Sequence, residues 1–202
     1  MRPFIFAALA AAMFAGNAQA QPGRLVMVGG ALDRDTAAVH QAMVSGLGPD
    51  GRVAVIPSAS GEPVQSARAY IATLAAYGVP AERIDIVHLA VRDDPATPDV
   101  DESTWASNGD SPAEIAKVAG ARAIWFTGGD QARTTQVLLD AAGGDRAVLT
   151  AIRQRLAAGA TVGGTSAGAA SMSTPTNARG ASLAARTHPL LEGAERASTM
   201  AG

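Results

Sequence analysis

The stretch TVGGTSAGAASMS, residues 161–173, places one serine, Ser166, between small residues at the end of an apolar run. Its centre, GTSAG, fits the pattern G-x-S-x-G, in which small residues two positions on either side of a serine let the backbone fold back between a strand and a helix. The Ser166 Oγ is then exposed, and the N–H of Ala167 points toward a site for an oxyanion. The alternative is that Ser166 only caps the following helix.

Four further apolar runs end, like this one, in small or turn-forming residues. The five runs are residues 24–30, 52–60, 83–90, 122–130 and 160–168. Their nearly continuous hydrophobicity favours strands that are buried on both faces. Helical patterns that end at or near glycines lie between the runs, at residues 33–47, 62–78, 131–143 and 145–159. This alternation predicts βαβ units and a parallel sheet with helices on both faces.

In such a sheet, ligands bind beyond the carboxyl ends of the strands. The glycine-rich segments are expected to meet at that edge, at residues 29–30, 58–61, 128–131 and 164–168. In FTGGDQ (126–131), Gly128 and Gly129 leave backbone N–H groups uncovered, which suits the second half of an oxyanion hole. A glycine pair that only serves helix entry is the alternative. Phosphate binding is less well supported, because no G-x-G-x-x-G or Walker pattern is present.

Three segments in this order resemble a known family. VIPSASGEP (55–63), FTGGDQARTTQVL (126–138) and GGTSAGAASMS (163–173) are similar to cyanophycinases, in the serine-peptidase group that also contains aspartyl dipeptidase. The resemblance extends from about Arg24 to Ser173. It implies a three-layer α/β/α fold with a mostly parallel sheet, of the class I glutamine amidotransferase-like (flavodoxin-like) kind. It also implies cleavage of cyanophycin, a poly-aspartate chain bearing arginine on its side-chain carboxyls, into β-Asp-Arg dipeptides.

The resemblance assigns roles to residues of the two glycine-rich segments. It implies Ser166 as the nucleophile, Gly129 and Ala167 as oxyanion donors, Gln131 as a substrate contact, and Asp130 and Arg133 as groups that orient the substrate. Acyl transfer of this kind needs no cofactor. No metal site is expected, because the three histidines are scattered without ligand spacing.

A serine nucleophile also needs a base, normally a histidine held by a carboxylate. The family has a DQHF-like stretch after its serine, and none is found in the 36 residues that follow Ser166. His188, in THPLLEG, is a candidate base, with Glu192 or Glu195 as its acid partner. His88 and His40 are interpreted as structural. We therefore expect a chain that is cut short or divergent at its C-terminus.

The first twenty residues have the organisation of a secretory signal peptide. Arg2 precedes an apolar stretch, and Ala18-Gln19-Ala20 forms a small-x-small cleavage site. An uncleaved membrane anchor is the alternative. Residues 21–202 are predicted to form a single α/β peptidase-like domain, exported to the periplasm or the extracellular space. The formal net charge of −2 without a basic run argues against a nucleic-acid partner, and the absence of cysteine excludes disulfides and cysteine chemistry.

Two other function classes stay open at this stage. One is a catalytically incomplete protein that binds an Asp/Arg peptide, and the other is an α/β-hydrolase esterase sharing the serine turn. The irregular segment 91–112 contributes carboxylates that suit an arginine-bearing substrate, or that only keep a loop solvated. These carboxylates are Asp93, Asp94, Asp99, Asp101, Glu102 and Asp110.

Overall fold

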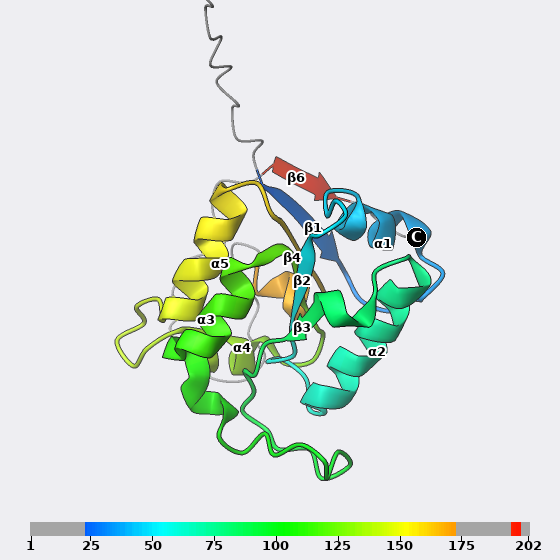
Figure 1. The fold of residues 1–202 in the computed structure, drawn as a ribbon. Coiled ribbons are helices and arrows are strands. Elements are labelled where there is room, and N and C mark those ends of the chain that lie inside the picture. The colour runs from blue at the N-terminus through cyan, green and yellow to red at the C-terminus, as the bar shows by residue number, and fades with distance from the viewer. Residues whose placement is uncertain (1–22, 173–194, 199–202) are drawn as a thin grey trace, which may run out of the picture.

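The computed structural model of the protein describes residues 23–172 and 195–198, which form one sheet and its flanking helices (Figure 1). The strands are β1 (Arg24–Val28), β2 (Arg52–Ile56), β3 (Ile84–Ile86), β4 (Ala121–Phe126), β5 (Thr161–Thr165) and β6 (Glu195–Ser198). The α-helices are α1 (Ala37–Val44), α2 (Pro63–Ala76), α3 (Pro112–Ala119), α4 (Gln131–Leu138), α5 (Ala147–Ala157) and α6 (Ala167–Ala170). Two 3₁₀ turns, η1 (Ala81–Arg83) and η2 (Trp105–Asp110), complete the described elements.

The strands lie in the order β3-β2-β4-β5-β1-β6, and every strand pair in the described part of the chain is parallel. The carboxyl ends of all these strands therefore lie at one edge of the sheet. The strand β5 lies between β4 and β1, with Gly164 opposite Phe126 on one side and opposite Met27 on the other. The residue that follows β5 consequently has the ends of β4 and β1 as its two neighbours.

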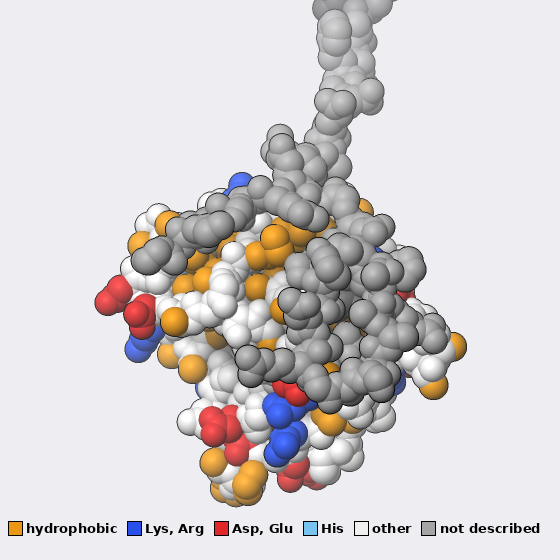
Figure 2. Space-filling model, turned by 180° about the vertical axis from the view of Figure 1, so that it is seen from behind, with side chains coloured by type: hydrophobic (Ala, Val, Ile, Leu, Met, Phe, Trp, Pro, Cys, Tyr) orange, Lys and Arg blue, Asp and Glu red, His pale blue; other side chains and the backbone are white. Residues whose placement is uncertain are grey.

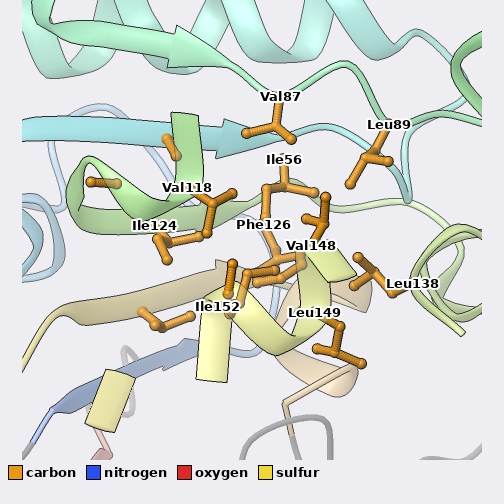
Figure 3. Close-up of a cluster of buried hydrophobic side chains, with 14 of the residues drawn as sticks. Ile56, Val87, Leu89, Val118, Ile124, Phe126, Leu138, Val148, Leu149 and Ile152 are labelled. Atoms are coloured by element: carbon orange, nitrogen blue, oxygen red, sulfur yellow. The ribbon is translucent and has the colours of Figure 1, made fainter. Parts of the chain in front are cut away.

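Helices cover both faces of the sheet, as Figure 1 shows: α1 and α2 lie on one side, and α3, α4 and α5 on the other. Side chains alternate along β4 between the two layers. Trp125 packs with the α1 and α2 side chains, whereas Ile124 and Phe126 join Val148 and Ile152 of α5 in the core of the second layer (Figure 3). The three-layer α/β/α architecture with a parallel sheet is confirmed.

Two segments differ from the sequence expectation. The run 83–90 forms a strand only at Ile84–Ile86, because a tight turn follows, in which the Leu89 N–H donates to the Val87 carbonyl at 2.8 Å. The segment 91–112, expected to be irregular, contains η2, and α3 begins at its last residue, Pro112. Proline is well suited to that position, since the first N–H of a helix has no partner within the helix.

The predicted signal peptide and His188 lie outside the described residues. No helix among the described residues is long and apolar enough to cross a membrane. On the face opposite to that of Figure 1, hydrophobic side chains gather in the upper middle part, and acidic and basic side chains lie at the left edge and in the lower part (Figure 2).

Candidate active site

Ser166 lies directly after β5, at the carboxyl edge of the sheet, between two glycine-rich strand ends. On the β4 side, a methyl group placed on Gly128 would lie 3.4 Å from the Ser166 Cβ. On the β1 side, a methyl group placed on Gly30 would lie 4.0 Å from the same atom. The expected meeting of these segments at one edge is thus observed, and glycine on both sides keeps the space around Ser166 open.

The backbone of Ser166 is in a conformation that side-chain-bearing residues rarely adopt, with φ 52° and ψ −118°. Such a conformation costs about 1–3 kcal/mol and persists only where the surroundings impose it. Here the Ser166 N–H donates to the Val28 carbonyl at 2.8 Å, and the Ser166 carbonyl accepts from the Ala170 N–H at 2.9 Å. The serine side chain is exposed and makes no capping hydrogen bond to α6. This geometry matches the predicted sharp strand-to-helix turn and not a helix cap.

The two outer glycines of the GTSAG motif are required by close backbone packing. A methyl group on Gly164 would approach the backbone carbon of Gly168 to 2.8 Å, and one on Gly168 would approach the carbonyl oxygens of Phe126 and Thr127 to 2.5 and 2.6 Å. Contacts below 3.0 Å with backbone atoms can be relieved only by a costly shift of the backbone. The motif therefore folds α6 tightly back against the ends of β4 and β5.

Two backbone N–H groups near Ser166, those of Ala167 and Gly129, are the ones that the sequence predicts as oxyanion donors. Ala167 is the first residue of α6, where N–H groups lack partners within the helix. Gly129 follows the end of β4 in an exposed turn with φ 142°, and a side chain there would collide with the Ala59 carbonyl. Within residues 23–172, neither N–H donates a hydrogen bond. Ala167 is 5% exposed, whereas Gly129 is exposed.

The residues expected to contact substrate lie at the start of α4. Asp130 caps this helix, with its carboxylate accepting from the Ala132 N–H at 2.9 Å. Gln131 is the first helical residue, and the Arg133 guanidinium donates to the Ala59 carbonyl at 3.1 Å. The helix thus presents these three side chains beside the Gly128–Gly129 turn, with Asp130 also serving a local structural role.

The histidines of the described chain do not reach Ser166. His88 follows β3, which is separated from β5 by β2 and β4, so three strand spacings of about 4.8 Å place them roughly 14 Å apart. His40 is 1% exposed, and its Nε2 lies 3.0 Å from the Asp33 carbonyl. Both are structural, as expected. The Ser166 Oγ makes no hydrogen bond with any described residue.

His88 belongs to a separate cluster on the β3 side. Its ring stacks on buried Trp105 at 4.3 Å, and the backbone N–H of His88 donates to the Glu114 carboxylate at 2.7 Å. Glu114 is buried and is neutralised by Lys117 at 2.8 Å. Burial, followed by the positive charge of Lys117, lowers the pKa of His88, and Glu114 opposes this shift. The cluster anchors α3 and η2 to the end of β3.

This cluster gives a prediction for the pH dependence of stability. Because the pKa of His88 is lower in the folded protein, the unfolded chain binds the proton more readily, and the free energy of unfolding falls as pH decreases through about 6.5. A His88→Phe variant keeps the stacking on Trp105 but cannot titrate. We expect its urea midpoint to fall less than that of the wild type between about pH 7.5 and about pH 5. Equal falls in the two proteins would contradict the assignment.

The carboxylates of segment 91–112 serve its own structure. Asp99 pairs with Arg68 at 2.6 Å and Asp110 with Arg146 at 2.9 Å, while Glu102 is 1% exposed and accepts from the Asp94 N–H at 3.1 Å. Among residues 23–172, no three His, Asp or Glu side chains are arranged so that they could hold a metal ion. These contacts support the interpretation of a self-stabilised loop over that of a substrate-binding acidic patch.

Comparison with known proteins supports the fold. No protein-family model matches the chain. A solved structure described as the crystal structure of a peptidase from an acI-B1 Actinobacterium is similar, with a TM-score of 0.54 and 19% sequence identity. The similarity covers 77% of this chain and 58% of that one, so this chain matches less than two thirds of that protein's length. At such low identity, the similarity establishes a shared α/β fold.

Sequence reasoning missed one pair of residues near the site. Ser58, after β2, and Thr134, in α4, are both fully buried, and their hydroxyl oxygens lie 2.8 Å apart. Ser58 was expected at the carboxyl edge, but no sequence signal links it to Thr134, 76 positions further along the chain. The available hint was Thr134 itself, a polar residue on the buried face of the helix predicted at residues 131–143.

Proposed function

We propose that the protein is a secreted serine exopeptidase of cyanophycinase type, which hydrolyses cyanophycin to β-Asp-Arg dipeptides with Ser166 as its nucleophile. The observation that carries this proposal is the strained, exposed Ser166 at the carboxyl edge, flanked by the N–H groups of Ala167 and Gly129, which donate to no other described residue. Strained backbone is concentrated at functional sites, because the surrounding structure must hold it in place. A shared fold with a solved peptidase is consistent with the proposal.

The chemistry follows from this arrangement. The Ser166 Oγ attacks the scissile carbonyl carbon, and its proton passes to a base, for which His188 is the candidate. The N–H groups of Ala167 and Gly129 stabilise the negative charge on the former carbonyl oxygen. The carbon–nitrogen bond then breaks, and the amine leaves with the proton. Water hydrolyses the resulting ester and regenerates the Ser166 hydroxyl.

The proposal is tested with the full chain expressed in a host that exports it. We expect the mature protein to begin at Gln21 and to release β-Asp-Arg from purified cyanophycin, measured by liquid chromatography. An N-terminus at Met1 would contradict export. Turnover of short acyl esters, with no action on β-aspartyl peptides, would instead favour an esterase.

A second candidate is a binding protein for an Asp/Arg peptide that lacks catalysis. The observation that favours it is that the Ser166 Oγ has no hydrogen-bond partner among residues 23–172. Isothermal titration calorimetry with β-Asp-Arg oligomers separates the two candidates. Tight binding without product release supports the binding protein, whereas product release supports the peptidase.

A further inference from the structure

The loop after β2 is tied to α4 by a buried hydrogen bond between side chains. The Ser58 and Thr134 hydroxyl oxygens are 2.8 Å apart, and both residues are fully buried. Each hydroxyl would be left without a partner if the other were removed, and a buried unpaired polar group is costly. The bond therefore fixes the position of the β2 loop relative to the first turns of α4.

The same loop holds the turn that carries the β4-side donor. The Ala59 carbonyl, next to Ser58, accepts from the Asp130 N–H at 2.8 Å and from the Arg133 guanidinium at 3.1 Å. Gly129 packs so closely on this carbonyl that a side chain cannot fit. The position of the Ala59 carbonyl thus determines where the Gly129 peptide lies.

The Gly128–Gly129 turn lies next to Ser166. Gly128, one residue before Gly129, is the glycine nearest the Ser166 Cβ on the β4 side. Because the Ala59 carbonyl contacts Gly129 and accepts from the Asp130 N–H, a displaced β2 loop would shift the Gly128–Gly129 turn and change the distance between the Gly129 N–H and the reacting oxygen. Oxyanion stabilisation depends steeply on that distance, since donors must lie about 2.7–3.1 Å from the oxyanion.

We propose that Ser58 and Thr134 are positioning residues that hold the Gly129 N–H in place for oxyanion stabilisation. This inference rests on the proposed function, because it needs Ser166 to act as a nucleophile. It predicts that loss of the hydroxyl pair lowers the rate of the chemical step and leaves initial binding nearly unchanged. Truncating an oxyanion donor costs roughly 10²–10³ in rate, so a displaced donor should cost about 10- to 100-fold.

The test uses a fluorophosphonate probe on the full mature protein. In the reaction the Ser166 Oγ forms a bond to phosphorus, the phosphorus–fluorine bond breaks, and fluoride leaves as the Oγ proton passes to solvent. Saturation kinetics give the inactivation rate and the inhibition constant separately. Thr134→Val keeps the side-chain shape but removes the hydroxyl, and Thr134→Ser keeps the hydroxyl. Thr73→Val removes another buried hydroxyl, which bonds to the Ala69 carbonyl in α2, as a control for general destabilisation.

We expect Thr134→Val to lower the inactivation rate about 10- to 100-fold with an inhibition constant within about twofold of the wild type. Thr134→Ser and Thr73→Val should retain the wild-type rate. If Thr134→Val folds poorly, Ser58→Ala removes the same hydrogen bond from the other side. All rates are normalised to the folded fraction of each variant. Wild-type rates in the folded Thr134→Val and Ser58→Ala variants would overturn the inference. Absence of Ser166 labelling in the wild type would instead refute the proposed function itself.

Discussion

Ser166→Ala is expected to lose cyanophycin hydrolysis by about 10⁶-fold, the scale of the loss when the nucleophile of a serine protease is removed. The substitution removes only the Oγ, which makes no hydrogen bond with the described residues. Alanine meets nearly the same backbone cost as serine at φ 52°. The variant should therefore keep its fold and its melting temperature within about 2 °C while losing turnover.

The matched control is Ser45→Ala. Ser45 is exposed and follows α1, and its hydroxyl accepts from the guanidinium of Arg24, the first residue of β1, at 3.0 Å, which places it at the amino edge of the sheet, opposite to Ser166. Release of β-Asp-Arg, followed by chromatography, should be unchanged in this control. Hydrolysis by Ser166→Ala at more than about a hundredth of the wild-type rate would exclude Ser166 as the nucleophile.

Much of the nucleophile turn could be predicted because its requirements are local. A serine can be exposed between a strand and a helix only where its second neighbours are small, and Gly164 and Gly168 are indeed in contact with backbone. The meeting of residues 128–131 with residues 164–168 also followed from a general rule. Parallel strands place their carboxyl ends at one edge, whichever strands are adjacent.

Features that depend on strand order and side-chain pairing could not be predicted in the same way. The distance of His88 from Ser166 follows from the placement of β2 and β4 between β3 and β5, which hydrophobic patterns do not reveal. The Ser58–Thr134 bond joins residues that are far apart in the chain, and neither residue has a local signal for the other. His188 lies outside the described residues, and its role as the base stays a prediction.

Gly168→Ala is the second substitution for which we expect a large effect, a loss in the free energy of unfolding. Two contributions of opposite sign determine its size. Gly168 lies within α6, where alanine is favoured over glycine by about 1 kcal/mol in helix propensity. The added methyl group would lie 2.5 and 2.6 Å from the carbonyl oxygens of Phe126 and Thr127, which belong to the end of β4. Overpacking against such backbone atoms costs about 3 kcal/mol or more. The clash should therefore outweigh propensity, with a net loss of about 2 kcal/mol or more.

This loss corresponds to a melting temperature about 4–8 °C below that of the wild type, measured by circular dichroism. Gly46→Ala is the matched control, since Gly46 is exposed, has an ordinary φ, and has no atom within 4 Å of an added methyl group. Its melting temperature should stay within about 2 °C of the wild type. A Gly168→Ala protein as stable as Gly46→Ala would show that propensity dominates and that α6 is not pressed against the end of β4. The tight turn that exposes Ser166 would then lose its steric basis, because the same backbone contact fixes both features.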